Sequence, residues 1–147
     1  MPEPEAPAVP ATREERTALA TRSGPGRALV AVYAVFALGA TARSVEQVAT
    51  RFGHAPLAFL LSGFAAVVYC VATYCLARAS STNRRIASVS LVVETVGVLV
   101  VGTLSLTARD LFPEATVWSD YGQGYLYIPV VLPVLGLLWL RRTGRTT

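Results

Sequence analysis

Lysine is absent from this sequence, and histidine, cysteine and charged residues of either sign are scarce. The single histidine, His54, excludes a histidine-rich metal site within one chain. Cys70 and Cys75 lie on one apolar block and point to different sides of a helix, so they cannot form a disulfide without unwinding it. The phosphate-binding loop, the G-x-S-x-G elbow and the dinucleotide fingerprint are also missing. The sequence therefore predicts no metal, no cofactor and no enzyme active site.

Apolar residues, in contrast, make up 53% of the chain, and they come in four long blocks. Charged residues account for only 15%, whereas soluble domains carry about 25%. A hydrocarbon core of about 30 Å needs roughly 20 helical residues, and backbone polar groups in lipid must be satisfied within the helix. We therefore predict an all-α fold, a four-transmembrane-helix bundle. The expected helices are about 28–51, 56–77, 85–107 and 124–141.

The arginines predict the orientation of this bundle. If the N-terminus lies in the cytoplasm, ten of the thirteen arginines fall on the cytoplasmic side, and only Arg43, Arg51 and Arg109 fall outside. Cytoplasmic loops carry an excess of basic residues, so both termini are predicted to be cytoplasmic in a multi-pass protein of the cell (plasma) membrane. Because the arginines sit at helix ends and not on one soluble face, the lipid bilayer is the expected partner, and nucleic acid is not.

The first 27 residues differ in composition from the rest. Residues 1–27 are rich in Pro, Glu, Arg and Thr, which predicts a disordered cytoplasmic tail before a transmembrane domain at 28–142. A short helix over 12–20 is an alternative for part of this tail. A second alternative concerns Ala40-Thr41-Ala42, which follows an apolar run and resembles a signal-peptide cleavage site. The long leader before the run and the helical pattern after it argue against cleavage, which would leave three helices.

Glu94 stands in the middle of the third block, "SLVVETVGVLVVGTLSL". An ionisable group at this depth usually faces the bundle interior and marks a functional hypothesis. Helical spacing places it on a face of small residues, while Leu91, Val92 and Leu99 are expected to face lipid. Loss of hydration favours the neutral form of the acid.

Two partners are predicted for Glu94. Tyr69 lies at a similar depth on the second helix, where Ser62, Ala66, Cys70 and Thr73 form a small-residue stripe. Arg43 approaches from the outer end, about 10 Å away along the helix axes. The acid is then a polar clamp between helices, a proton- or cation-binding group in transport, or a contact for a basic residue of a partner protein.

The long loop 107–125 is predicted to form part of an outer cap. It is rich in aromatic residues, and a short interfacial helix is expected over 113–121. The candidate outer-face partner surface consists of Trp118, Asp120, Tyr121 and Tyr125. Acidic loop residues near His54 offer a loose cation site as an alternative to simple solvated charges. They are Asp110, Glu114 and Asp120.

Several segments together resemble a group of small, uncharacterised four-helix integral membrane proteins of actinobacteria. The segments are "ARSVEQ", "HAPLAFLLS", "ETVGVLVVGTLSL", "LFPEATVWSDYGQGY" and "LPVLGLLWLRR". The resemblance covers about residues 28–142 and implies no activity. Small multidrug exporters also combine four helices with an embedded Glu, but their acid lies in the first helix, where this chain has only Arg43 and Glu46 near the outer end.

These patterns favour a non-enzymatic accessory or scaffold subunit of a membrane complex, bound to a membrane-protein partner or to further copies of itself. The first alternative is a small proton- or cation-coupled carrier or pore component that uses Glu94. The second is a membrane-embedded lipid-processing enzyme.

Overall fold

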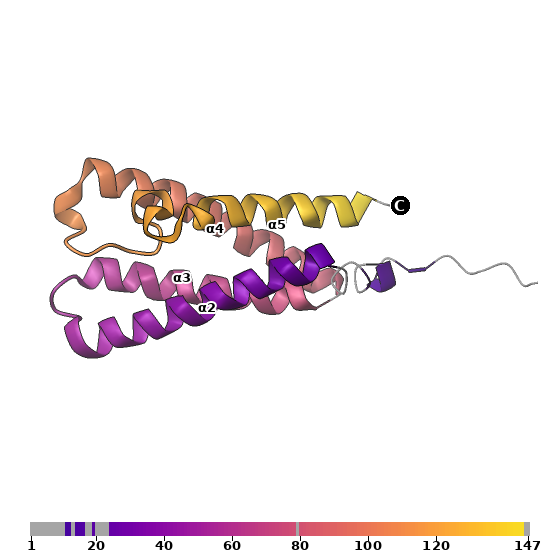
Figure 1. Cartoon of the computed structure of the whole chain (residues 1–147), viewed down its shortest axis with the longest axis horizontal. Helices are drawn as coiled ribbons and strands as arrows, with labels where there is room; N and C mark the ends of the chain where they lie inside the picture. The colour runs from indigo at the N-terminus through magenta and orange to yellow at the C-terminus, as the bar shows by residue number, and fades with distance from the viewer. Residues whose placement is uncertain (1–10, 13, 17–18, 20–23, 79, 146–147) are drawn as a thin grey trace, which may run out of the picture.

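The computed structural model describes residues 11–12, 14–16, 19, 24–78 and 80–145, and this part of the chain is helical with no strand. Within the described residues the chain forms four long helices and two short 3₁₀ turns. The long helices lie side by side in one elongated bundle (Figure 1). The long helices are α2 (Gly24–Arg51), α3 (Pro56–Ala77), α4 (Ser81–Thr107) and α5 (Ile128–Arg145). The 3₁₀ turns are η1 (Arg109–Leu111) and η2 (Ser119–Tyr125). The predicted all-α class is confirmed, whereas most of the predicted tail lies outside the described residues.

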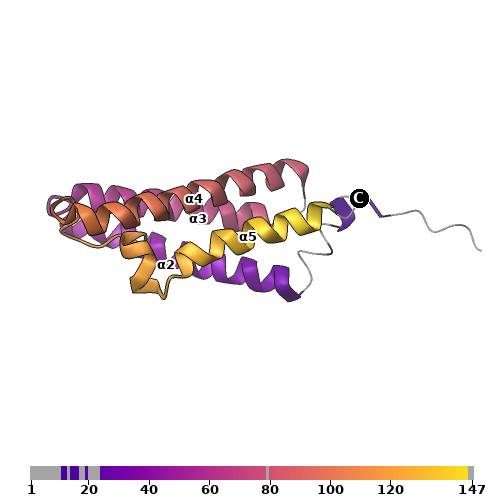
Figure 2. The ribbon, with the colours of Figure 1, turned by 90° about the horizontal axis from the view of Figure 1, so that it is seen from above.

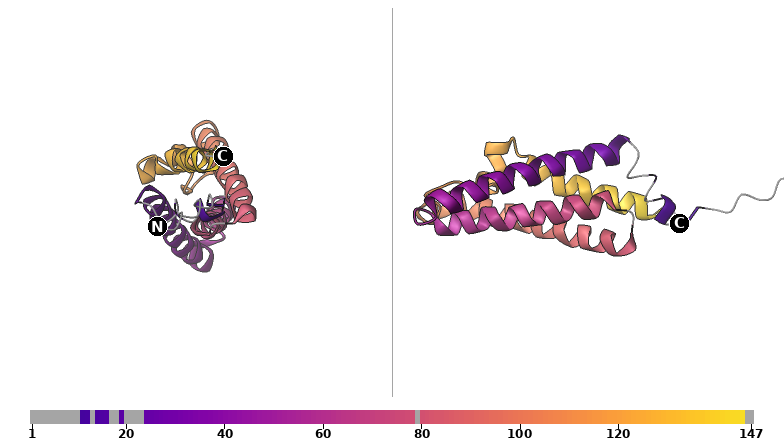
Figure 3. Two further views of the ribbon diagram at one scale, coloured as in Figure 1. Left: turned by 90° about the vertical axis from the view of Figure 1, so that its right-hand side faces the viewer. Right: turned by 90° about the horizontal axis from the view of Figure 1, so that it is seen from below.

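The bundle consists of two antiparallel hairpins. α2 packs along α3, α3 along α4 and α4 along α5, whereas α2 and α5 meet only briefly. Viewed down the bundle, α2 and α3 therefore lie on one side and α4 and α5 on the other (Figure 3). We call the end at which α2 and α4 begin and α3 and α5 end the terminal end. The opposite end, with the 52–55 turn and the 108–127 connection, is the loop end.

Three helices, α2, α3 and α4, are long and apolar enough to cross a membrane. α5 provides a fourth crossing only together with η2, from which it is bent by 95°. The outward surface fits a lipid environment, because large apolar side chains recur every three or four residues along it. On α3 these exposed residues are Leu57, Leu60, Phe64, Val67, Val71 and Tyr74. The membrane-spanning class is supported, with three or four spans.

Local chemistry explains where the helices begin. α3 has the predicted bounds, with Pro56 in its first turn, where a missing N–H leaves no acceptor unsatisfied. α4 begins at Ser81 and not at about 85, because the Ser80 hydroxyl caps it by accepting from the Asn83 N–H at 3.4 Å. α2 begins at Gly24 and not at about 28, so residues 24–27 belong to the bundle and not to the tail.

Small residues bring α2 and α3 close together. Ala37, Ala40 and Ser44 of α2 are buried, as are Ser62 and Ala66 of α3. Small side chains allow helix backbones in membranes to approach closely, which is the main source of their packing energy. In the predicted stripe on α3, Ser62 and Ala66 are buried, and Cys70, although exposed, contacts α2 with its Sγ atom 3.7 Å from the Thr41 hydroxyl.

The 108–127 segment is not the interfacial helix predicted over 113–121. It folds back over the loop end beside α4, and α5 begins only at Ile128, four residues later than expected (Figure 2). Asp120, Tyr121, Leu126 and Tyr127 all have left-handed backbone angles, with φ between 51° and 58°. These turns interrupt regular helix before Pro129. We call residues 112–127 the cap.

The cap fits against α4 because two helix positions carry no side chain. A Cβ atom at Gly97 would lie 2.5 Å from Cζ3 of Trp118, and one at Gly102 would lie 2.5 Å from Cδ1 of Tyr121. Real contacts are never this close, so these glycines form the seats of the two aromatic rings. From the loop end, the cap therefore reaches to within one turn of the middle of α4.

We predict that Gly97→Ala lowers the free energy of unfolding by about 1–3 kcal/mol, because the added methyl overpacks the Trp118 seat. Gly63→Ala is the matched control, since a Cβ at Gly63 meets no atom within 4 Å. We expect it to change stability by less than about 1 kcal/mol, in the stabilising direction. Denaturation in mixed micelles measures the free energy of unfolding of both variants. Equal stability of the two would contradict close packing of Trp118 on Gly97.

Candidate functional site

Glu94 lies midway between the two ends of α4 and is completely buried, with 0% of its surface exposed. The Tyr33 hydroxyl donates a hydrogen bond of 2.8 Å to its Oε2 atom. Tyr33 is equally buried and belongs to α2, a helix that does not pack along α4. This hydrogen bond therefore crosses the centre of the bundle and joins one hairpin to the other.

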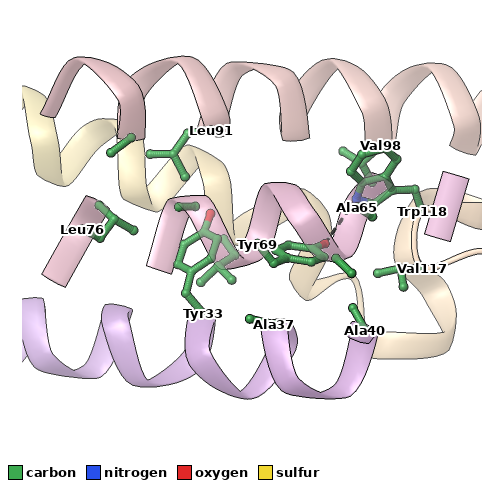
Figure 4. Close-up of a cluster of buried hydrophobic side chains, with 14 of the residues drawn as sticks. Tyr33, Ala37, Ala40, Ala65, Tyr69, Leu76, Leu91, Val98, Val117 and Trp118 are labelled. Atoms are coloured by element: carbon green, nitrogen blue, oxygen red, sulfur yellow. Dashed lines mark hydrogen bonds between the residues drawn. The ribbon is translucent and has the colours of Figure 1, made fainter. Parts of the chain in front are cut away.

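A second polar link lies beside the first. The Trp118 indole Nε1 donates to the Tyr69 hydroxyl at 3.2 Å, connecting the cap to α3 (Figure 4). Tyr69 also interacts electrostatically with Glu94, but only Tyr33 meets the geometry of a hydrogen bond to it. The other carboxyl oxygen, Oε1, is buried without a hydrogen-bond partner in the described part of the chain. The four side chains Tyr33, Tyr69, Glu94 and Trp118 form what we call the central polar cluster.

Aromatic rings enclose this cluster. Tyr33 and Tyr69 have ring centroids 6.2 Å apart, and Phe36 packs on Tyr69 at 5.8 Å. On the other side, the Phe64 ring meets the edge of Trp118 at 6.1 Å. Apolar walls lower the local dielectric, which strengthens a hydrogen bond inside and penalises an unpaired polar group. The cavities described at the two ends of the bundle do not include Glu94 among their lining residues.

Two predictions about the surroundings of Glu94 were wrong. Arg43 does not reach it, because its guanidinium donates to the Tyr125 hydroxyl at 2.8 Å and to the Ala115 carbonyl at 3.0 Å. Leu91 does not face lipid, because it is completely buried against Gly136 of α5. Val92 and Leu99 are about half exposed, as expected for the lipid-facing side.

The predicted outer-face surface divides into two parts. Trp118 was wrongly placed there, since it is 1% exposed in the interior. Tyr121 packs on Gly102, and its hydroxyl lies 2.9 Å from that of Thr103. Asp120 and Tyr125 are half-buried and line a cavity of about 520 Å³ together with Arg43. This cavity therefore combines Arg43, which was predicted as a partner of Glu94, with Asp120 and Tyr125 of the predicted outer-face surface. The sequence did not indicate that these three residues lie together.

Sequence reasoning missed Tyr33, although the helical rise could have identified it. Tyr33 lies about 14 Å from the start of α2 and Glu94 about 20 Å from the start of α4, measured from the same end. The difference of about 6 Å is within reach of a tyrosine side chain. Tyr33 is also the first polar side chain in the apolar part of α2.

The chemistry of the cluster is limited to holding or exchanging a proton or a small cation at Glu94. Within the described residues, no three His, Cys, Asp or Glu side chains gather closely enough to bind a metal ion. Of the loose cation site near His54, the structure places only Glu114 nearby, 3.9 Å from the imidazole Nε2. Of the predicted intramembrane site, Tyr69 and Glu94 lie inside the bundle, whereas Arg43 contacts the cap.

We predict that Tyr33→Phe lowers the free energy of unfolding by about 1–3 kcal/mol, because the buried carboxyl loses its donor while the ring is kept. Tyr74→Phe is the control, since Tyr74 is 57% exposed and packs only its ring face against Arg78. It should change stability by less than about 0.5 kcal/mol. Denaturation in mixed micelles tests the pair, and a neutral Tyr33→Phe would contradict a clamp at this position.

Comparison with known proteins finds no matching family model, no similar curated protein and no similar solved structure. The resemblance to small actinobacterial membrane proteins remains an expectation from the sequence. Any functional conclusion must therefore come from the geometry of this chain, above all from the central polar cluster and the cap.

Proposed function

We propose that this protein is a non-enzymatic accessory or scaffold subunit of a membrane complex, with both termini in the cytoplasm. One observation supports this proposal above the others: Glu94 is completely buried and hydrogen-bonded to Tyr33. A buried acid that accepts a hydrogen bond from a tyrosine of another helix holds the two helices together. The interior then keeps the bundle rigid, and other molecules bind to its outer surfaces.

The packing around Glu94 supports the clamp. Removing one partner from a buried polar pair leaves the other unsatisfied in a medium without water, so both partners must stay in place. Tyr33 and Trp118 tie α2 and the cap to the same central point, between elements that share little other contact. A protein whose halves are fixed in this way presents constant surfaces, as a scaffold requires.

A proton- or cation-coupled carrier is the second proposal, and a separate observation favours it. Oε1 of Glu94 has no hydrogen-bond partner among the described residues, which leaves one oxygen able to hold a proton or contact a cation. Alternating access would then require the cap to withdraw from the centre. The strained backbone at Tyr121 and Leu126 is consistent with a segment that has more than one conformation.

Two substitutions at one position separate these proposals. Glu94→Gln keeps an oxygen acceptor for Tyr33, so a clamp predicts stability within about 1 kcal/mol of wild type, whereas Glu94→Ala should lose about 2–4 kcal/mol. A carrier predicts pH-driven flux in reconstituted vesicles that Glu94→Gln abolishes. Glu46→Gln is the matched control, because Glu46 pairs with Arg51 at the loop end, away from the cluster. Flux that survives in Glu46→Gln but not in Glu94→Gln would replace the scaffold proposal by the carrier.

Purification from native membranes in mild detergent provides the positive test of the scaffold. We expect a partner membrane protein, or a homo-oligomer, in stoichiometric amounts. Tyr33→Phe should reduce this recovery only as far as it reduces the amount of folded protein. A chain recovered alone and monomeric would count against the proposal.

The orientation has its own test. In a Cys70→Ala, Cys75→Ala background, single cysteines replace Thr82 at the terminal end and Asp110 at the loop end, both of which are exposed. We predict that a membrane-impermeant thiol reagent labels the residue-110 cysteine on intact cells and the residue-82 cysteine only after permeabilisation, because most arginines lie at the terminal end. Labelling of both on the same side would contradict the topology.

A further inference from the structure

The cavity between α2 and the cap contains two side chains of opposite charge. Arg43 and Asp120 both line this space of about 520 Å³, together with the polar side chain of Gln123. Neither belongs to the central polar cluster, and the scaffold and carrier proposals make no use of either. Although the bundle has few charged residues, two of opposite sign line this cavity and do not form an ion pair with each other.

The depth of the cavity indicates what surrounds it. Arg43 lies about 28 Å from the start of α2 and Glu94 about 20 Å from the start of α4, so Arg43 lies about 9 Å closer to the loop end than Glu94. Half the thickness of a hydrocarbon core is about 15 Å. If Glu94 marks the middle of the membrane, Arg43 lies in the outer part of one leaflet, where an arginine side chain of about 6 Å reaches the lipid headgroups.

The Arg43 guanidinium has no carboxylate partner among the described residues. Its hydrogen bonds go to a hydroxyl and a carbonyl, both neutral, and the described residues contain no carboxylate within 4.0 Å of it. These two acceptors leave further N–H donors of the guanidinium unused. They also fix the side chain in place, so its donors are already oriented for an anion such as a phosphate.

Asp120 is held on the same cavity by a strained backbone. Its φ of 51° is left-handed, and its N–H donates to the Ser105 hydroxyl of α4 at 2.8 Å. In the described part of the chain, its carboxylate accepts no hydrogen bond and forms no ion pair. Strained conformations of this kind cluster at functional sites, where the surrounding structure maintains them. Here the left-handed turn fixes a carboxylate on the wall of the cavity that Arg43 also lines.

We propose that this cavity binds the headgroup of a zwitterionic aminophospholipid, with the phosphate on Arg43 and the primary ammonium on Asp120. A ligand that carries both charges satisfies two side chains that do not pair with each other. An anionic lipid would satisfy Arg43 but would be repelled by Asp120. The inference depends on the membrane location and holds equally for a scaffold and for a carrier.

Native mass spectrometry of the full chain in mild detergent, with equimolar short-chain phosphatidylethanolamine and phosphatidylglycerol, tests the proposal. We expect the wild type to favour phosphatidylethanolamine by about tenfold, the loss expected when one charge-assisted hydrogen bond is missing. Asp120→Asn should bring the ratio of bound phosphatidylethanolamine to bound phosphatidylglycerol close to one. Asparagine tolerates the left-handed backbone, so the variant removes charge without altering the turn. Arg43→Gln should weaken the binding of both lipids.

Matched controls keep the outcome specific. Asp110→Asn removes an exposed acid of η1, and Arg141→Gln removes a guanidinium from a separate cavity at the terminal end. Both should retain the wild-type preference. Equal binding of the two lipids by the wild type, or an unchanged preference in Asp120→Asn, would overturn the proposal. If Arg43→Gln fails to fold, Asp120→Asn decides alone. Free phosphoethanolamine that displaces the lipid at equal concentration would assign the cavity to a soluble zwitterion instead.

Discussion

The hydrogen bond from Tyr33 to Glu94 is the interaction on which the rest of the structure depends. An acid at the centre of a membrane helix has no water to solvate it, so a partner must reach it from another helix. That partner lies on α2, across the bundle and on the other hairpin. The two hairpins must therefore pack in one register, and the aromatic rings around the pair exclude other polar contacts.

The shape of the fourth element follows from a second constraint. By length and composition, α5 makes a possible fourth crossing only together with η2. Irregular backbone at membrane depth is tolerated only where protein covers it. The cap has such cover, because Trp118 lies in the interior and η2 lies beside α4. Gly97 and Gly102 make this possible, because any side chain at these positions would occupy the space of the rings.

How far the sequence predicted this arrangement differs from element to element. The bounds of α3 followed from an apolar block of the right length that begins with Pro56, because proline is favoured in the first turn of a helix. The place of Trp118 did not follow, since tryptophans usually mark the membrane interface and only the two glycines of another helix reveal a seat for it. Glu94 was expected to face inward and does, but its donor Tyr33 lies about 6 Å away along the helix axes, a distance that only the length of the tyrosine side chain bridges. The left-handed turns of the cap were beyond prediction, since Tyr121 and Leu126 are residues that rarely adopt them.

The cap also connects the two sites that the structure defines. Trp118 donates a hydrogen bond to Tyr69 beside the buried acid. Two residues later, the Asp120 N–H donates to the Ser105 hydroxyl, and Asp120 lines the cavity that contains Arg43. Because the intervening backbone is tightly turned, withdrawal of Trp118 from the centre would also move Asp120. A headgroup held between Arg43 and Asp120 would in turn keep the cap against α2 and Trp118 in its seat. Lipid bound at the loop end and the hydrogen bonds at the centre therefore stabilise the same conformation, although about 15 Å of helix separates Arg43 from Tyr33.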